Sequence, residues 1–400
     1  MRSQGILSSF GVLAALAATV GAQGVADLYA RCGGEGWTGP TLCPDGAYCM
    51  VLNQWWSSCQ PVPVTACPSF GPYIDPNSQT DGLNSFAVRR GKYFGTAGDW
   101  VYANVMNCTW SQIATDPSEF GVLTTGNSQK WDTTEATQGV FNFDAADQFV
   151  AWGLKYGKKF RGHTLVWYNQ LPAWVTGGTW NATTLTTVLQ NHITTEVTHF
   201  KGKMMHWDVV NEPFNEDGTY RSNIWYQIIG PDYIPIALRA AAAADPAAKL
   251  YINEYNVEGV NPKSTALLNL FKSLKAAGVP IHGLGIQGHL IVGQVPTDMP
   301  ANFNRFVAAG ADIAITELDI RMNVPPVNQT ASFAQQAADY ATVAYACKVT
   351  GRCQGITIWD ISDKNSWIPG VFAGQGDALP WDVNYQKKPA YYGLATTLKP

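Results

Sequence analysis

The chain has 400 residues, of which 46% are hydrophobic, 12% aromatic and 14% charged, with a formal net charge of −4. This length suggests one large domain with a small additional one. The modest negative charge excludes the basic surface that nucleic acid or anionic lipid requires. The 15 Trp and 17 Tyr residues exceed what a core usually needs. Because flat aromatic rings stack on sugars, we expect a neutral, carbohydrate-like ligand.

Residues 1–22 are predicted to form a secretory signal peptide. Arg2 precedes an apolar run from Ile6 to Val20, which ends in the small residues Gly21 and Ala22. The run is too short for a stable membrane span, and no later stretch of about 18 apolar residues follows. We therefore expect a secreted, extracellular protein without a membrane anchor. An oxidising compartment favours disulfides over metal sites for its eight Cys residues.

Three Asn-x-Thr triplets are candidate glycosylation sites, and they begin at Asn107, Asn181 and Asn328. Glycans attach where the backbone is exposed. We expect these three positions on surface loops.

Residues 23–60 are predicted to form a small, disulfide-stabilised β module. Cys32, Cys43, Cys49 and Cys59 lie within a Gly-rich stretch that is too short to fold on an apolar core alone. Four Cys residues allow three pairings, and spacing does not choose among them. The string CGGEGWTGPTLCPDGAYCMVLNQWWSSC closely resembles the fungal family 1 carbohydrate-binding module. This resemblance implies the pairs Cys32–Cys49 and Cys43–Cys59.

The same resemblance implies a flat cellulose-binding face formed by Tyr29, Trp55 and Trp56, assisted by Asn53. Trp37 either adds to this face or packs beneath it. These aromatics could instead form the core of the module. A fold this small has little interior to hide them, and an exposed aromatic patch usually marks a binding surface. We therefore expect cellulose as the partner of the module.

Residues 61–81 are predicted to be a short linker, because they are rich in Pro, Ser and Asn and lack an apolar period. Cys67 lies in this linker, and Cys108 is the only other Cys without a near neighbour in sequence. A bridge between Cys67 and Cys108 would tether the linker to the large domain. Cys347 and Cys353 would then close a small loop.

Residues 82–400 are predicted to fold as an α/β domain, a (β/α)8 barrel. Short apolar or β-branched runs alternate with segments of helical period, such as 183–201 and 262–277. Eight such runs in about 300 residues indicate a closed barrel of parallel strands. The runs are KYFGTAGD, FGVLTTGNS, RGHTLVWY, MHWDVVNE, KLYINEYN, IHGLGIQGH, DIAITELD and GITIWDIS.

Polar and aromatic residues gather at the C-terminal ends of these runs. In a (β/α)8 barrel the active site lies at that face, whereas the strand interiors are buried. We therefore expect one site built from Asn127, His163, Trp167, Asn211, Glu212, Glu254, Gln287, His289, Glu317 and Trp359.

Two of these residues, Glu212 and Glu317, offer the chemistry that a glycosidic bond requires. Its cleavage needs a proton on the leaving oxygen and stabilisation of charge at the anomeric carbon, which a pair of carboxyl groups supplies. Glu212 ends the fourth run and Glu317 the seventh, so both can face one cleft. A solvated or ion-paired carboxylate is the alternative for a lone Glu, but two on one rim favour catalysis.

The motifs WDVVNEP and ITELD, together with KWD, RGHTLVW, NEYNVEG and KKPAYYG, resemble glycoside hydrolase family 10, the retaining endo-β-1,4-xylanases. The resemblance implies that Glu212 is the acid/base and Glu317 the nucleophile, without a metal or cofactor. It implies that Asn211 binds the 2-hydroxyl, that His289 contacts the nucleophile, and that Asp319 orients this His. The substrate-binding residues it implies are Asn127, Lys130, His163, Trp167 and Gln287, with Trp359 and Trp367 stacking on sugar. Trp131 and Trp207 are expected in the core instead.

The chain departs from the family pattern at Gly126, Tyr168 and Ile368. The family usually has Glu, His and Arg at these positions, so substrate recognition is the part in question. The first expectation is a monomeric endo-xylanase acting on xylan; replacing Gly126 by Glu and Tyr168 by His should then raise activity, unless neighbouring groups fill the space. The second is a hydrolase of the same mechanism that prefers another β-glycoside. A non-catalytic wall-binding protein is the third, but both glutamates are retained.

Overall fold

The computed structural model describes residues 25–27, 30–34, 36–43, 47–53, 56–61, 81–100, 105 and 107–400, with the backbone alone at 48, 50–53, 56, 60 and 61. The predicted signal peptide (1–22) and nearly all of the predicted linker (61–81) lie outside these residues. Contacts divide the chain into two units, Met1–Ala66 and Cys67–Pro400, with the boundary inside this linker. No helix in the described part of the chain is long and apolar enough to cross a membrane.

The small unit is a three-stranded antiparallel sheet with the order β1-β3-β2, formed by β1 (Arg31–Gly33), β2 (Ala47–Asn53) and β3 (Trp56–Pro61). Disulfides join Cys32 to Cys49 and Cys43 to Cys59, the pairs that the family resemblance implies. Among the side chains that the structure describes in this unit, the buried apolar residues are Ala26, Cys32 and Cys59. A module of fewer than about 40 residues gains little hydrophobic stabilisation from its core, and the two disulfides stabilise its fold.

The predicted cellulose-binding face lies largely outside the described side chains. Tyr29 and Trp55 are not among the described residues, and Asn53 pairs with Trp56 where β2 meets β3. Trp37 is half-buried, and the Arg31 guanidinium lies 4.8 Å from its ring centroid. One face of Trp37 is therefore covered. The binding face itself stays a prediction.

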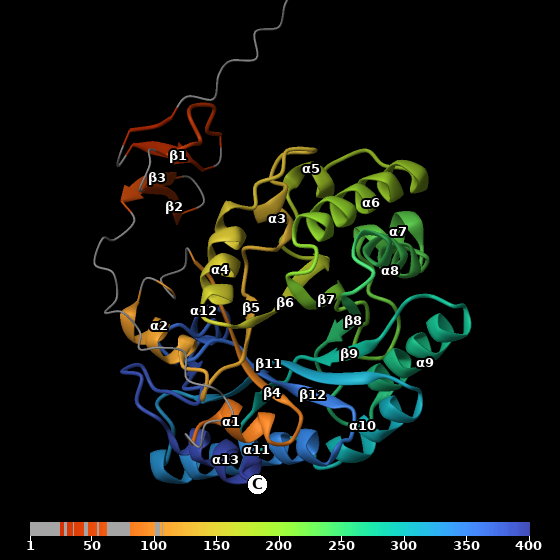
Figure 1. Cartoon of the computed structure of the whole chain (residues 1–400). Coiled ribbons are helices and arrows are strands. Elements are labelled where there is room, and N and C mark those ends of the chain that lie inside the picture. The colour runs from red at the N-terminus through yellow and green to blue at the C-terminus, as the bar shows by residue number, and fades with distance from the viewer. Residues whose placement is uncertain are drawn as a thin grey trace, which may run out of the picture. The chain divides into compact units, whose positions relative to one another are not determined.

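Eight parallel strands close into a barrel in the large unit, which confirms the predicted fold (Figure 1). The eight strands follow one another in chain order around the barrel, and the last, β12, pairs with the first, β4, which closes the barrel. The strands are β4 (Tyr93–Gly98), β5 (Val122–Thr125), β6 (Lys159–Val166), β7 (Met204–Asn211), β8 (Lys249–Glu254), β9 (Gly283–Ile286), β11 (Asp312–Asn323) and β12 (Cys353–Ile358).

Helices surround the barrel (Figure 1). The helices predicted at 183–201 and 262–277 are α6 and α9, and each begins with an Asn capping box. The helices are α1 (Leu83–Val88), α2 (Cys108–Thr115), α3 (Trp131–Thr134), α4 (Asp144–Lys155), α5 (Ala173–Thr176), α6 (Ala182–His199), α7 (Ile224–Ile229), α8 (Tyr233–Ala244), α9 (Pro262–Ala276), α10 (Met299–Ala308), α11 (Gln329–Val349), α12 (Ile368–Val371) and α13 (Pro389–Leu398).

The three glycosylation candidates share a structural role. Asn107, Asn181 and Asn328 are the N-cap residues of α2, α6 and α11, and each side-chain oxygen accepts a hydrogen bond from a backbone N–H of the first turn. Such caps satisfy donors that a helix start leaves unpaired. Capping thus accounts for these Asn residues by itself, and their glycosylation stays a prediction.

The segment 281–289, expected as one strand, is two. After β9 the chain turns at Gly288, whose φ of 81° favours glycine, and continues as β10 (His289–Ile291) along the outer half of β11. The short β13 (Gln375–Gly376) pairs with β11 beyond that point. The break lets Gln287 and His289 reach different partners, as described below.

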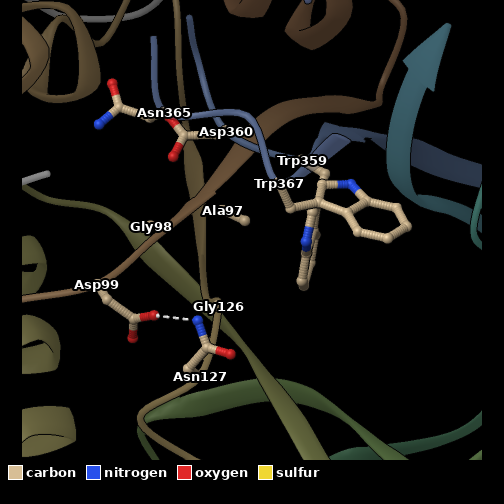
Figure 2. Close-up of a pocket in the computed structure, with 9 residues that line it drawn as sticks. All are labelled: Ala97, Gly98, Asp99, Gly126, Asn127, Trp359, Asp360, Asn365 and Trp367. Carbon is tan, nitrogen blue, oxygen red and sulfur yellow. Dashed lines mark hydrogen bonds between the residues drawn. The ribbon is translucent and has the colours of Figure 1, made fainter. Parts of the chain in front are cut away.

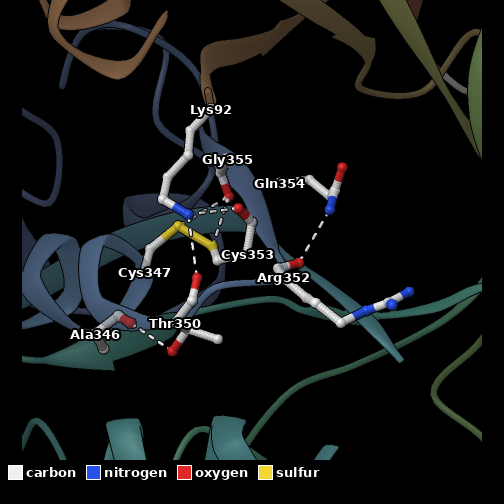
Figure 3. The surroundings of a disulfide bond; sticks show 8 residues. All are labelled: Lys92, Ala346, Cys347, Thr350, Arg352, Cys353, Gln354 and Gly355. Carbon is white, nitrogen blue, oxygen red and sulfur yellow. Dashed lines mark hydrogen bonds between the residues drawn. A yellow bond between two sulfur atoms is a disulfide. The ribbon is translucent and has the colours of Figure 1, made fainter. Parts of the chain in front are cut away.

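The Cys347–Cys353 disulfide joins the end of α11 to the start of β12 (Figure 3). Beside it, the Lys92 ammonium donates to the carbonyl oxygens of Thr350 at 3.1 Å and Cys353 at 2.7 Å. These bonds fix the connection from the last helix–strand pair to the first strand. Cys67 lies outside the described residues, so the Cys67–Cys108 bridge stays a prediction.

Candidate active site

Two buried carboxyl groups stand at the C-terminal face of the barrel. Glu212 follows β7 and is 7% exposed, while Glu317 lies in β11 and is 5% exposed. Glu212 has a φ of 56°, which is rare for a residue with a side chain. Its backbone N–H donates to the Asn253 carbonyl at 2.9 Å. A backbone held in this region often marks a functional position.

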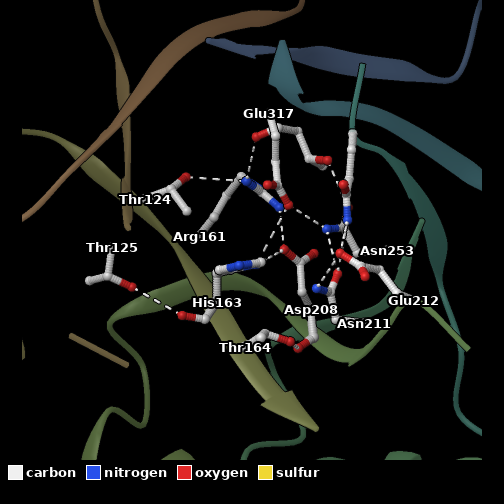
Figure 4. Close-up of polar contacts among 12 residues, drawn as sticks. Thr124, Thr125, Arg161, His163, Thr164, Asp208, Asn211, Glu212, Asn253 and Glu317 are labelled. Atoms are coloured by element: carbon white, nitrogen blue, oxygen red, sulfur yellow. Dashed lines mark hydrogen bonds and ion pairs between the residues drawn. The ribbon is translucent and has the colours of Figure 1, made fainter. Parts of the chain in front are cut away.

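A chain of amide groups links these two carboxylates (Figure 4). The Asn253 amide donates to Glu317 Oε1 at 2.7 Å and to Asn211 Oδ1 at 2.9 Å. The Gln287 amide donates to Glu212 Oε1 at 3.0 Å and to Asn211 Oδ1 at 3.3 Å. Both amides therefore bond Asn211, whose own N–H group lies 3.3 Å from Glu212 Oε1. Sequence reasoning missed Asn253, although it begins the motif NEYNVEG.

His289 lies between two carboxylates. Its Nδ1 is 2.9 Å from Asp319 Oδ2 and its Nε2 is 3.2 Å from Glu317 Oε2. Burial alone would lower the pKa of His289, but Asp319 and Glu317 outweigh it and raise that pKa to about 10. Both ring nitrogens therefore carry hydrogen and donate. Burial favours a high pKa for Glu317, but His163 and His289 lower this pKa below its ordinary value. Glu317 is thus held ionised, as a nucleophile must be.

The buried Asp208 carboxylate, with Arg161 and His163 beside it, lies near Glu317 on the opposite side from Asn253 (Figure 4). Asp208 Oδ2 accepts hydrogen bonds from Arg161 and, at 2.9 Å, from His163. Burial opposes the charge of Asp208, but Arg161 and His163 lower its pKa to about 2. His163 Nδ1 also lies 3.9 Å from Glu317 Oε1. Sequence reasoning missed Arg161 and Asp208, which stand in the quoted motifs RGHTLVW and WDVVNEP.

His163, Asp208 and Glu317 are close enough together to bind a metal ion. However, the Arg161 guanidinium already donates to the Asp208 oxygen that would be a ligand. A divalent cation would have to displace Arg161 and lose its buried ion pair, which costs several kcal/mol. The donor set therefore fits an internal ion pair better than a metal site.

The two carboxylates and their hydrogen-bond partners form one wall of the site, and Lys130, Asn127 and Trp167 form a second. The Lys130 ammonium donates to Asn127 Oδ1 at 3.1 Å and to Gln170 Oε1 at 2.7 Å, and lies 5.1 Å from the Trp167 ring centroid. Burial lowers the pKa of Lys130, although Glu317 and Asp99 oppose this shift. Sequence reasoning missed Gln170, which lies three residues after Trp167 in LVWYNQLP.

Trp359 and Trp367 form a third, aromatic wall. Trp359 follows β12 and meets the His163 ring edge to face at 5.2 Å. Trp367 donates from its indole to Asp319 Oδ2 at 2.8 Å and meets the His289 ring at 4.9 Å. Both indoles are half-buried, so each retains surface on which a sugar can stack. Trp131 and Trp207 are core residues, as expected.

Glu254 was expected on the same rim, but the structure directs it elsewhere. Its side chain is fully buried, pairs with the Lys263 ammonium at 3.0 Å and accepts from the Phe214 N–H at 3.1 Å. Burial, opposed by Lys263, raises the pKa of Glu254 to about 8. Glu254 therefore supports the backbone after Glu212 rather than facing the cleft.

The departures from the family pattern have distinct surroundings. A Cβ atom at Gly126 would lie 2.9 Å from Asp99 Oδ2, so a carboxylate already occupies that space. The Arg221 guanidinium lies 4.3 Å from the Tyr168 ring centroid, and burial and the neighbouring Glu212 carboxylate raise the pKa of Tyr168 to about 12. Ile368 is fully buried at the start of α12.

The comparisons with known proteins agree with this geometry. The glycosyl hydrolase family 10 model matches residues 82–397. The chain belongs to glycosyl hydrolase family 10. The model of the fungal cellulose binding domain matches residues 28–56, so the resemblances noted in both parts of the sequence are confirmed.

Several relatives of this glycosyl hydrolase, and several similar proteins of solved structure, are named as xylanases. Endo-1,4-beta-xylanase A of Phanerodontia chrysosporium is 47% identical over 97% of this chain and 98% of its own length. An endo-1,4-beta-xylanase of Agaricus bisporus is 49% identical over 78% of this chain and 93% of its own. The Penicillium canescens endo-1,4-beta-xylanase structure superposes with a TM-score of 0.78 at 40% identity, covering 80% of this chain and 99% of that one. Xylanase 10B of Thermotoga petrophila, solved with xylobiose, gives 0.77 at 38% identity, covering 80% and 98%.

Proposed function

We propose that this chain is a secreted, monomeric endo-1,4-β-xylanase that hydrolyses xylan with retention of anomeric configuration. The observation that carries the proposal is the pair of buried carboxyl groups at the mouth of the barrel, Glu212 and Glu317, with His163 and His289 lowering the pKa of Glu317. Family membership and the names of the relatives support xylan as the substrate.

In the proposed reaction, Glu317 attacks the anomeric carbon while Glu212 protonates the departing glycosidic oxygen. The covalent glycosyl-enzyme is then hydrolysed by a water molecule that Glu212, now ionised, deprotonates. Retention requires that the two carboxyl groups lie about 5 to 5.5 Å apart. His289, which Asp319 orients, donates a hydrogen bond to Glu317 and so keeps the Glu317 carboxylate ionised and in position.

The remaining residues would bind the sugars on either side of the cleavage point. Asn211, oriented by two amide donors, is suited to bind a hydroxyl next to the reacting carbon. Lys130, Asn127 and Gln287 supply further polar groups, and Trp167, Trp359 and Trp367 supply aromatic surface. Neutral hydroxyls and ring faces match these groups, and no cofactor takes part in the proposed mechanism.

The N-terminal module would hold the enzyme on plant cell wall. Its match to the fungal cellulose binding domain supports cellulose as its partner, with Tyr29, Trp55, Trp56 and Asn53 as the contact residues. Cellulose and xylan occur together in the wall, so a tether to one raises the local concentration of the other. The predicted signal peptide supports secretion.

Product analysis on xylan, cellulose and aryl β-glycosides, side by side, tests this function. We expect xylo-oligosaccharides from xylan, with the β-anomer appearing first when the reaction is followed by NMR. Initial release of the α-anomer would contradict retention. Preferential cleavage of a non-xylan glycoside would favour the alternative hydrolase, which Gly126 motivates. A protein that binds cell wall and releases nothing would exclude both.

A further inference from the structure

A pocket is lined in part by Trp359 and Trp367 of the aromatic wall, and its lining includes neither Glu212 nor Glu317 (Figure 2). Its cavity volume is about 220 Å³. One wall follows the ends of β4 and β5, and the other follows β12. The lining residues are Ala97, Gly98, Asp99, Gly126 and Asn127 on the first wall and Trp359, Asp360, Asn365 and Trp367 on the second.

The Asp99 carboxylate is fixed in this pocket by its neighbours. Its Oδ1 accepts from the Ser128 backbone N–H at 3.1 Å, and its Oδ2 accepts from the Asn127 amide at 3.3 Å (Figure 2). Burial raises the pKa of Asp99, with Ser128, Lys130 and Asn127 opposing the shift. Asp99 is therefore a positioned hydrogen-bonding group and not a mobile surface charge.

Gly126 is what allows the carboxylate to lie there. A Cβ atom at this position would come within 2.9 Å of Asp99 Oδ2, closer than such contacts normally are. The Gly126 backbone does not have a positive φ, so its conformation does not itself demand glycine. The absence of a side chain at Gly126 thus leaves room for the Asp99 carboxylate, so a substitution at either residue should affect the other.

The lining chemistry selects a neutral, hydroxyl-rich ligand. Two acidic groups, Asp99 and Asp360, accept hydrogen bonds, two carboxamides donate and accept them, and two indoles offer ring faces. The described lining contains neither Lys nor Arg, so a carboxylate on the ligand would be desolvated without a cation to pair with. The Lys130 ammonium is not part of the lining and is engaged by Asn127 and Gln170.

We propose that Asp99, in the space left open by Gly126, is a specificity-determining residue that binds hydroxyls of the sugar next to the reacting one and excludes uronate-bearing residues. The proposal rests on the function proposed above. The pocket shares Trp359 and Trp367 with the aromatic wall of the active site, but its lining includes neither Glu212 nor Glu317. A sugar bound in this pocket would therefore be the neighbour of the reacting sugar. A contact made only by that neighbour affects a disaccharide substrate more than a monosaccharide one.

The test compares Asp99→Asn and Gly126→Ala with the native enzyme on 4-nitrophenyl β-xyloside and β-xylobioside. Loss of one hydrogen bond to a charged group should lower kcat/KM on the xylobioside about tenfold, with much less change on the xyloside. Gly126→Ala should act in the same direction, because its methyl group displaces the carboxylate without removing the charge. Asp99→Asn should also narrow the preference for unbranched over uronate-branched xylo-oligosaccharides.

Asp116→Asn is the matched control, because the Asp116 carboxylate, like that of Asp99, accepts from a backbone N–H, here that of Ser118 at 2.8 Å, but does not line the pocket. This change should leave kcat/KM on both aryl substrates unchanged. Melting temperatures identify variants that fold poorly. Equal losses on both aryl substrates would assign Asp99 a structural role and overturn the proposal, as would native behaviour of Asp99→Asn. A native enzyme that does not cleave xylan at all would instead refute the proposed function.

Discussion

Trp367 and His289 donate hydrogen bonds to the same oxygen, Asp319 Oδ2, at 2.8 and 2.9 Å. His289 in turn lies 3.2 Å from Glu317. The aromatic wall on which a sugar would stack is therefore connected to the proposed nucleophile through two side chains. A change in the position of Trp367 should therefore alter the pKa of Glu317 as well as the binding of sugar.

Trp367→Phe should separate these two effects. Phenylalanine keeps a ring but removes the donor to the buried Asp319, at a cost of about 1 to 3 kcal/mol. We expect kcat to fall about tenfold, since 1.4 kcal/mol corresponds to a factor of ten. Trp359→Phe is the matched control, because it trims a ring in the same wall without changing a donor to Asp319. Equal effects of both changes on kcat would contradict the connection.

The charge of His289 should make stability depend on pH. Its folded-state pKa of about 10 lies above the unfolded-state value of about 6.5. The stabilisation is therefore complete below pH about 6.5 and is lost as pH rises toward 10. We expect the difference in melting temperature between the native enzyme and His289→Gln to shrink over this range. In the same variant the pKa of Glu317 should rise, moving the acidic limb of the kcat/KM profile to higher pH. A constant difference and an unmoved limb would be evidence against a charged His289.

Substitution of the two glutamates should give different kinetic signatures. Glu317→Gln should abolish the covalent intermediate with every substrate. In contrast, Glu212→Gln should still form it from aryl glycosides with good leaving groups, because these need no proton. Trapping with a 2-fluoro xyloside and mass spectrometry distinguishes the two variants. Identical behaviour on both steps would rule out the assigned roles.

Binding to cellulose should be separable from catalysis. Removal of residues 1–60, or the change of Trp55 and Trp56 to Ala, should abolish retention on crystalline cellulose while leaving turnover of soluble xylan nearly unchanged. Pull-down with microcrystalline cellulose and a reducing-sugar assay measure the two properties. If the shortened enzyme still pelleted with cellulose, the binding surface would have to lie on the barrel.

Gly126→Glu by itself should lower activity. From the sequence, a gain was expected for Gly126→Glu combined with Tyr168→His, provided that neighbouring loops leave the space open, and the structure places Asp99 Oδ2 2.9 Å from the new Cβ. Two acidic groups in one partly buried space repel each other. We expect kcat/KM on xylo-oligosaccharides to fall at least several-fold, and Gly126→Glu combined with Asp99→Ser to recover part of the loss. A gain from the single change would show that Asp99 moves aside.

Much of this molecule could be predicted from its sequence because the decisive signals are local. Apolar runs that alternate with helical segments predict a parallel barrel, and such a barrel places residues at its strand ends on one face. Glu212 and Glu317 follow from this rule together with their motifs. The capping boxes of α6 and α9 are equally local, since a cap involves residues only three apart.

Contacts between distant segments were decided only by the tertiary structure. Asn253 was identifiable as part of a motif, but its bond to Glu317 exists because β8, β9 and β11 lie side by side. The burial of Glu254 against Lys263 likewise depends on where α9 packs. From the sequence, Gly126 was interpreted as the loss of a carboxylate. The pairing of β4 with β5, however, brings the Asp99 carboxylate into the same space. Sequence periodicity reports which face a residue occupies, but which side chains meet depends on distances that barrel closure sets.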